Sequence, residues 1–149
     1  MQMQTIRICF CGNAPLPSGC AWGRAAPALQ ERSAGCCLGR RGHQRHKPRR
    51  AQAQLRDGDV LARYGGEEFI VLLCGSNQAI ARAVAERLRA AMAEPPVQID
   101  GVAVNVRISV GLALRLDADE TLARTIERAD CNLYRAKREG RNRVVDDSL

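Results

Sequence analysis

The sequence predicts an α/β (α+β) fold in which a central sheet is covered by helices, and three observations support this prediction. Apolar and polar residues alternate along residues 102–110, which indicates a strand with one buried face. Apolar residues recur at steps of three and four along residues 78–92 and 122–136, which indicates two amphipathic helices. Turn signals at residues 65–66 and 100–101 indicate two β-hairpins.

Length and charge limit the possible functions. The 149 residues suffice for one domain with its own core, and no apolar run approaches the roughly 18 residues of a membrane segment. The start of the chain carries little positive charge and is not typical of a secretory signal. The net charge of +7 suggests a nucleic-acid or membrane partner, but residues 1–50 hold 9 Lys/Arg and one acid, Glu31. Residues 51–149 hold 14 Lys/Arg and 15 Asp/Glu, so we expect no nucleic-acid partner for this part.

Residues 1–50 differ from the rest in composition. They are rich in Gly, Pro, Cys and Arg and show no lasting periodicity, and only residues 5–10 could form a short strand. Residues 39–50 are a charge run that could be a basic arm for RNA or anionic lipid, although no interleaved aromatic residue supports base stacking. We therefore predict two parts, an atypical basic region over residues 1–50, disordered or frame-shifted, and a folded portion over residues 51–149.

Two further interpretations of the first part stay open. A zinc site is one, but adjacent cysteines do not match the usual ligand spacing; its candidate ligands are Cys36, Cys37, His43 and His46. The other is that the segment comes from a displaced reading frame or a mis-assigned start, which the abrupt change of composition near Ala51 favours.

Cysteine usage predicts the compartment. The count of seven is odd, and five of the cysteines lie in the first 37 residues. Cys74 and Cys131 lie in apolar settings typical of free buried thiols. We therefore expect a reducing, cytoplasmic environment.

The folded portion begins with a turn and a hairpin. Residues 51–55 can continue a helix, and residues 56–59 are typical of a turn, with Gly58 able to adopt left-handed angles. Val60 and Leu61 enter a strand that leads to the glycine pair at 65–66. The apolar run at residues 69–73 is short enough to be a buried strand.

A helix and a second hairpin follow. Ser76 or Asn77 can cap a helix over residues 78–92, whose apolar face includes Ile80, and two prolines end it at 95–96. Residues 97–99 lead into the Asp-Gly turn at 100–101, and the alternating strand over residues 102–110 comes next.

The last helix and a short strand complete the fold. A cap between Asp119 and Thr121 begins the helix, and Gly140 ends it. Lys137, Arg138 and Arg141 suit the negative end of its dipole. Val144 and Val145 can form a final strand.

The first hairpin carries candidate metal-binding residues. Glu67 and Glu68 follow the glycine pair directly, and a tip with two acids and little side-chain bulk can hold a divalent cation over a phosphate. Without other motifs, the alternative interpretation is a solvated acidic turn.

Three motifs in order resemble one family. Residues 63–69 (Arg-Tyr-Gly-Gly-Glu-Glu-Phe) resemble the signature of the GGDEF domain, the catalytic domain of diguanylate cyclases, in its Gly-Gly-Glu-Glu-Phe form. Residues 109–113 resemble its Ser-x-Gly-x-Ala strand end, and residues 129–144 its closing Ala-Asp-x-x-Leu-Tyr-x-Ala-Lys-x-x-Gly-Arg-Asn block. The resemblance covers residues 51 to about 145 and none of residues 1–50, and it displaces the solvated-turn interpretation.

This resemblance implies a palm-like fold, as in nucleotide cyclases and polymerases, and a reaction. Family members condense two GTP into cyclic di-GMP and release pyrophosphate with Mg²⁺ or Mn²⁺, as head-to-head homodimers in which each domain brings one GTP. It implies Glu67 and Glu68 as catalytic metal ligands, with Glu67 nearest the attacking hydroxyl. Gly65 and Gly66 would let the backbone approach the nucleotide. The implied ligands of the phosphate oxygens are Lys137 and Arg141.

A second site is also implied. Arg56 and Asp59 match the family's product-inhibition motif, in which arginine pairs with guanine and phosphate groups of cyclic di-GMP. Arg87 matches a further inhibitory arginine. The alternative is that residues 56–59 are only a charged turn.

The sequence also departs from the family. Residues 1–50 lack the first-strand Asp-x-Asp-x-Phe-Lys pattern that completes the metal site and the Asn-Asp…Gly-His…Gly-Asp pattern that reads guanine. We therefore expect the N-terminal strand and helices to be missing or replaced. That would leave an unpaired hydrophobic sheet edge at the strand of Leu61 and an exposed apolar face at Val104, Val106 and Ile108. We expect weak cyclase activity, and the alternative function is a degenerate module that binds cyclic di-GMP without catalysis.

Overall fold

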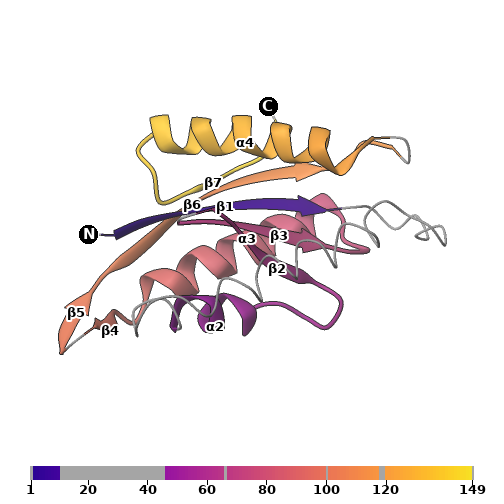
Figure 1. Ribbon diagram of the computed structural model, residues 1–149. Coiled ribbons are helices and arrows are strands. Elements are labelled where there is room, and N and C mark those ends of the chain that lie inside the picture. Colours follow the sequence, from indigo (N-terminus) through magenta and orange to yellow (C-terminus); the bar gives the residue numbers. More distant parts are fainter. Residues whose placement is uncertain (1, 11–45, 66, 100, 118–119, 149) are drawn as a thin grey trace.

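The structure of the chain is a computed structural model that describes residues 2–10, 46–65, 67–99, 101–117 and 120–148. The chain combines helices and strands (Figure 1). In chain order the elements are β1 (Gln2–Phe10), α2 (His46–Gln52), β2 (Val60–Gly65), β3 (Glu68–Leu73), α3 (Gln78–Ala93), β4 (Val97–Ile99), β5 (Val102–Val104), β6 (Val106–Leu114), α4 (Leu122–Arg138) and β7 (Val144–Val145).

Five strands form one mixed sheet in the order β2-β3-β1-β6-β7, which confirms the predicted α/β class. The central strand is β1, which pairs in parallel with both β3 and β6. β2 is the antiparallel edge strand, and β7 pairs in parallel with β6. The first strand position is therefore filled, by residues that carry none of the acids of the family pattern.

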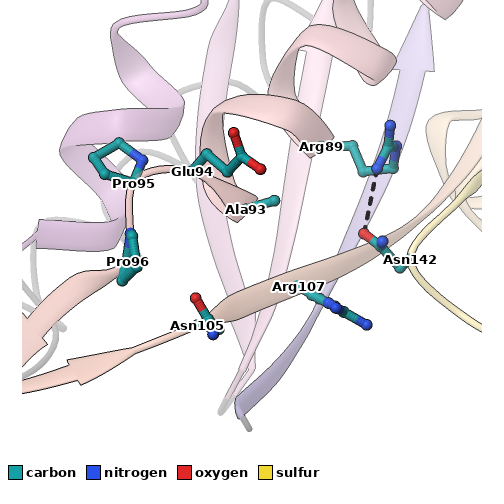
Figure 2. Close-up of a pocket in the computed structure, with 8 residues that line it drawn as sticks. All are labelled: Arg89, Ala93, Glu94, Pro95, Pro96, Asn105, Arg107 and Asn142. Atoms are coloured by element: carbon teal, nitrogen blue, oxygen red, sulfur yellow. Dashed lines mark hydrogen bonds between the residues drawn. The ribbon is translucent and has the colours of Figure 1, made fainter.

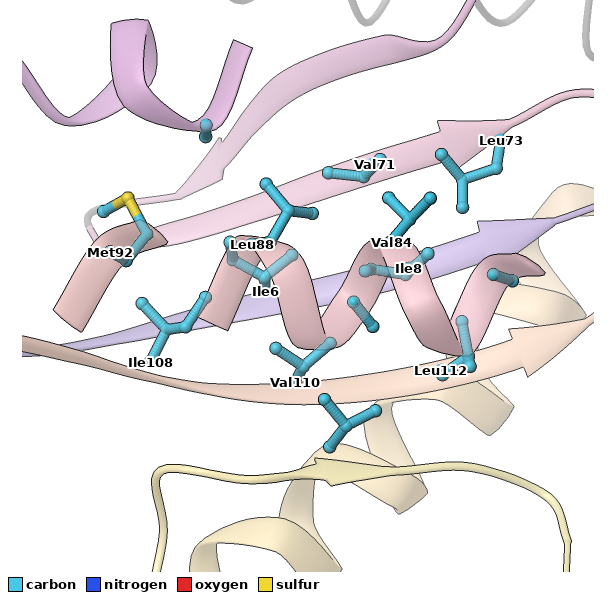
Figure 3. Packing of buried hydrophobic residues seen from close by; sticks show 14 of the residues in the cluster. Ile6, Ile8, Val71, Leu73, Val84, Leu88, Met92, Ile108, Val110 and Leu112 are labelled. Carbon is cyan, nitrogen blue, oxygen red and sulfur yellow. The ribbon is translucent and has the colours of Figure 1, made fainter. Parts of the chain in front are cut away.

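The largest core cluster lies between the sheet and α3, with α2 at its margin (Figures 1 and 3). Ile6 and Ile8 contribute from β1, and both are buried. Val106 and Ile108 are 1% and 0% exposed, so the expected exposed apolar face is wrong for these two residues, while Val104 on β5 is half-buried. The reason is that β1 pairs with β6 and α3 covers that face, and Leu61 on the edge strand also packs against this core.

A smaller cluster lies on the opposite face, beneath α4, with Ile70 and Ala129 at its centre. Gly111 explains the close approach of this helix. A Cβ atom added there would lie 2.5 Å from the Leu133 backbone nitrogen and would also strike the Ala129 carbonyl oxygen. The glycine of the Ser-x-Gly-x-Ala motif is therefore the point where α4 rests on the sheet.

Most predicted boundaries agree with the structure, and one strand does not. The predicted strand over residues 102–110 is two strands, because the chain leaves its pairing with β4 at Asn105 and joins β1 along β6. Asn77 caps α3, its Oδ1 accepting from the Ile80 amide at 2.9 Å, and Thr121 caps α4. Ile80 itself is 47% exposed, because it lies in the first turn of α3, outside the core cluster.

The cysteine prediction is wrong in one respect. Cys74 and Cys131 are free thiols, but Cys131 is exposed and Cys74 is half-buried. Cys131 lies on the outer surface of α4, whose packed face is formed by its neighbours Ala129, Asn132 and Leu133. Burial is therefore not the reason that these two cysteines form no disulfide.

Several expectations concern residues outside the described ranges. Cys36, Cys37, His43, Gly66, Asp100 and Asp119 lie there, so the zinc hypothesis stays a prediction. The division at residue 51 also stays a prediction, and α2 runs across that position. In the described part of the chain, no helix has the length and apolarity needed to cross a bilayer.

Candidate functional site

The acidic half of the site is the tip of the β2–β3 hairpin. Gly65 is the last residue of β2, and its register partner is Glu68, the first residue of β3, next to a bulge. Glu67 lies in the turn, is exposed, and has no hydrogen bond or ion pair with a described residue. An added Cβ at Gly65 would lie 3.5 Å from Glu68 Oε2, an ordinary contact. Packing within the chain therefore does not require glycine at this position.

One row of residues runs across the sheet from this hairpin. Glu68 is level with Thr5 on β1, and Thr5 is level with Ser109 on β6. Ser109 Oγ then accepts a hydrogen bond at 3.3 Å from the amide of Asn142, in the loop after α4. Two strand spacings separate Glu68 from Ser109, about 10 Å in all. The row thus connects the hairpin to the loop that follows α4.

The basic half of the site is on that helix end and loop. Lys137 lies in the last turn of α4 and is half-buried. Arg141 follows Gly140 and has φ 64°, and its amide donates to the Ala136 carbonyl at 2.9 Å. Neither side chain makes an ion pair with a described residue. Because α4 runs opposite to the parallel strands β1, β3 and β6, its C-terminal end lies at the end of the sheet where these strands begin, next to the hairpin (Figure 1).

This donor set fits a divalent cation only together with a ligand. Mg²⁺ is commonly held by one or two carboxylates plus substrate phosphates, and Glu67 and Glu68 supply two carboxylates. The strand beside them offers Thr5 at the register position of Glu68, and not an acid. Across the described ranges, no cluster of three or more His, Cys, Asp or Glu could hold a metal. A phosphate-bearing ligand would have to supply the remaining oxygens.

The residues of the implied inhibitory site come together in the structure. Arg56 Nε lies 3.5 Å from Asp59 Oδ1, and the Arg56 amide donates to Asp59 Oδ2 at 3.2 Å. The same guanidinium donates to the Cys74 carbonyl and, at 3.1 Å, to Ser76 Oγ. The Asp59 side chain is 3% exposed and that of Arg56 is 56% exposed. Asp59 therefore positions the arginine, which remains open to solvent.

Arg87 reaches this turn from α3. Its guanidinium donates to the carbonyl oxygen of Gln54, two residues before Arg56, and its side chain is exposed. Two guanidinium groups from segments about 30 residues apart thus lie along one turn. The contacts of Arg56 with residues 74–76 carried no signal in the sequence, which marked Ser76 only as a possible helix cap.

A polar network at the C-terminal end was also not predicted. Arg82 on α3 pairs with Asp146 at 2.6 Å, and Arg128 on α4 pairs with Asp147. Burial raises the pKa of Asp146, but hydrogen bonds from Arg82 and Ser148 outweigh this and leave that pKa below its ordinary value. Arg82 and Asp146 are 64 positions apart, so no local pattern could have indicated the pair.

Sequence comparisons identify the family. The family model described as "Diguanylate cyclase, GGDEF domain" matches residues 47–143. Diguanylate cyclase A of Treponema denticola is 46% identical over 90 residues, which cover 60% of this chain and 24% of that protein. Diguanylate cyclase DgcP of Pseudomonas aeruginosa is 43% identical over 91 residues, covering 61% of this chain and 13% of that protein. The chain thus spans a quarter or less of the length of these relatives.

Solved structures show the same fold. The GGDEF domain of TpbB (YfiN) from Pseudomonas aeruginosa superposes with a TM-score of 0.65 at 29% identity, covering 86% of this chain and 76% of that one. The active GGEEF domain of a diguanylate cyclase from Vibrio cholerae superposes with a TM-score of 0.56 at 27% identity, covering 69% and 65%. With the family model matching well over half of its residues, the chain belongs to the GGDEF diguanylate cyclase family.

Proposed function

We propose that this chain is a diguanylate cyclase-type domain that binds GTP at the hairpin and the end of α4, with weak turnover to cyclic di-GMP. The observation that supports binding is the row from Glu68 through Thr5 and Ser109 to the loop of Arg141. This row links the hairpin that carries Glu67 and Glu68 to the loop after α4, and Lys137 and Arg141 flank the start of that loop. Such an arrangement suits a triphosphate held between cations and a metal ion.

Each group would have a distinct task. Glu67 and Glu68 would hold Mg²⁺ or Mn²⁺, which neutralises phosphate charge and polarises the attacking 3′-hydroxyl when bound. Lys137 and Arg141 would bind phosphate oxygens, and both side chains lack an ion-pair partner among the described residues. Gly65 and Gly66 would let the backbone approach the nucleotide, and Glu67 would lie nearest the reacting hydroxyl.

Weak turnover follows from what surrounds the carboxylates. The register partner of Glu68 on β1 is Thr5, and β1 carries no acidic residue at any position. A metal held by two carboxylates alone depends on the substrate phosphates for its other ligands. Condensation also needs a second GTP, so we expect any activity to require a homodimer. We expect this activity in the cytoplasm.

Calorimetry with GTP and Mg²⁺ on the full chain tests the binding site. We expect binding that weakens about tenfold in Lys137→Ala, because a charge-assisted contact to phosphate is lost. Arg124→Ala is the matched control, since Arg124 is exposed on α4 and its side chain makes no hydrogen bond or ion pair with a described residue. Equal affinities for the wild type and Lys137→Ala would refute this assignment.

A second function is favoured by the contacts of Arg56, Asp59 and Arg87. Both arginines are exposed and are held in place by the buried Asp59 carboxylate and by backbone carbonyls. Exposed, positioned guanidinium groups suit the phosphates and planar guanines of cyclic di-GMP. The chain would then sense cyclic di-GMP whether or not it makes it.

Calorimetry with cyclic di-GMP separates this second function from the first. We expect Arg56→Ala to weaken binding by roughly 10- to 100-fold, because several charge-assisted hydrogen bonds disappear. Lys137→Ala should leave this affinity unchanged. If Arg56→Ala binds cyclic di-GMP as tightly as the wild type does, the proposed cyclic di-GMP-binding function is excluded.

A further inference from the structure

A cavity borders the loop of Asn142, between the C-terminal end of α3, the segment before β4 and the start of β6 (Figure 2). Its volume is about 820 Å³, within the range of roughly 300–1,000 Å³ common for small-molecule sites. Asn142 is its nearest link to the GTP site, because Arg141 precedes it in the same loop.

One end of the cavity is cationic and rich in amides. Arg89 is held by Glu86 at 2.8 Å and donates to Asn142 Oδ1 at 3.4 Å, which leaves other guanidinium donors unused. Arg107 is exposed and makes no hydrogen bond or ion pair with a described residue. Asn105 adds a further exposed amide. Such groups suit phosphate oxygens.

The other end combines an acceptor with apolar walls (Figure 2). The exposed Glu94 carboxylate can accept hydrogen bonds, while Ala93, Pro95 and Pro96 offer apolar surface beside it. Arg50 on α2 donates to the Pro95 and Pro96 carbonyls, so this wall is fixed from a second element.

Charge balance points to a ligand with two unlike ends. Glu86 and Glu94 offset the charges of Arg89 and Arg107, so a bare anion gains little net attraction. A flat base with N–H donors matches Glu94 and the prolines, and a phosphate tail matches the arginines. We propose that this cavity is a binding site for a nucleoside phosphate, separate from the GTP and cyclic di-GMP sites.

The test uses calorimetry on the full chain carrying Lys137→Ala and Arg141→Ala, with GTP as the probe in EDTA. The two substitutions and the chelator remove the proposed catalytic site, so remaining binding reports other sites. We expect GTP to bind this variant, about tenfold weaker after Arg107→Ala and several-fold weaker after Glu94→Gln. Arg124→Ala, added as the control, should change the affinity less than twofold.

Pyrophosphate and cyclic di-GMP distinguish the remaining outcomes. Pyrophosphate should bind more weakly than GTP, and Glu94→Gln should not weaken its binding, because the substitution removes a negative charge and no contact to an anion. Pyrophosphate binding as tight as GTP would mean a simple anion site and would overturn the proposal. Loss of all GTP binding in the Lys137→Ala and Arg141→Ala background would overturn it too, while supporting the catalytic site. If GTP binding disappears when Arg56→Ala is added, the binding measured by calorimetry belongs to the cyclic di-GMP site, and the proposal is overturned.

Discussion

The hairpin tip and the turn at residues 56–59 differ in how completely their charged groups are paired. At the hairpin, the side chain of Glu67 makes no hydrogen bond or ion pair with a described residue. The same holds for the side chains of Lys137, in the last turn of α4, and Arg141, in the loop after it. At the turn, Asp59 is buried and holds Arg56, which also binds the end of β3. A site whose groups are already held loses less conformational entropy on binding. The turn is therefore the better-organised site of the two.

The difference also shows what each site needs from outside. In the proposed function, the hairpin needs a metal ion to offset the charge of two adjacent carboxylates, and it needs substrate phosphates to complete the ligands of that metal. The turn needs only a ligand with acceptors for exposed guanidinium groups. We therefore expect binding of cyclic di-GMP to tolerate changes that abolish binding of GTP, and the following substitutions test this expectation.

The largest expected effect comes from Gly111→Ala. The added Cβ would strike backbone atoms of α4 and should destabilise the fold by about 3 kcal/mol, since backbone cannot move aside as a side chain can. α4 packs on β6, β1 and β7, so the displaced helix end should weaken GTP binding more than cyclic di-GMP binding. Thermal or urea unfolding measures the first effect and calorimetry the second.

Gly75→Ala is the glycine control for that experiment. Gly75 has φ 59° and open space around its Cβ position, so only backbone strain of about 1 kcal/mol is expected. If Gly111→Ala costs no more than this control, close packing of α4 on Gly111 is not the constraint.

Arg87→Ala should weaken cyclic di-GMP binding about tenfold, or about 1.4 kcal/mol, through loss of one charge-assisted contact. The substitution removes a hydrogen bond to the Gln54 carbonyl at an exposed position, so stability should change little. GTP binding with Mg²⁺ should stay the same. If Arg87→Ala binds cyclic di-GMP as tightly as the wild type does, the second site is limited to the turn at residues 56–59.

Glu67→Gln and Glu68→Gln should each weaken Mg²⁺-dependent GTP binding about fivefold, because one carboxylate still remains to hold the metal. Cyclic di-GMP binding should not change in either variant. Titration with GTP in the presence and absence of Mg²⁺ gives the metal-dependent part. A loss of cyclic di-GMP binding in these variants would mean that the two regions are one site.

The smallest effect concerns pH and lies outside both regions. Asp146 has a pKa below its ordinary value of 3.8, so its charged form stabilises the fold above that value. This contribution is lost as the pH falls through the lowered pKa. Arg82→Gln should reduce the difference in unfolding free energy between neutral pH and about pH 3, and ligand binding at neutral pH should be unchanged.

Asp146→Asn is the control for this pH dependence. It removes the titrating group, so Arg82→Gln should add no further pH dependence in its background. Chemical unfolding at the two pH values measures both variants, and an unchanged pH dependence in Arg82→Gln would disprove the role of the pair.

Local patterns in the sequence predicted much of this fold. The steps of three and four along α3, the caps at Asn77 and Thr121 and the short β7 all arise from neighbours in the chain. The central position of β1 could not be predicted in this way. It depends on pairing with β3 and β6, which lie more than 50 residues further along.

The candidate site shows the same limit. Its acids and glycines stand together in the sequence, but the connection from Glu68 to the loop of Asn142 exists only through the sheet. The burial of Asp59 and the contacts of Arg56 with Cys74 and Ser76 likewise depend on tertiary packing. Local patterns could indicate which residues to consider but not how they are held.

Turnover of GTP tests the central claim most directly. The full chain is incubated with GTP and Mg²⁺ at high protein concentration, so that a dimer can form, and cyclic di-GMP is quantified over time. We predict little product, with cyclic di-GMP nonetheless binding to the same sample through Arg56. Steady, multiple-turnover formation of cyclic di-GMP that Glu67→Gln abolishes would contradict the view that the hairpin site is incomplete.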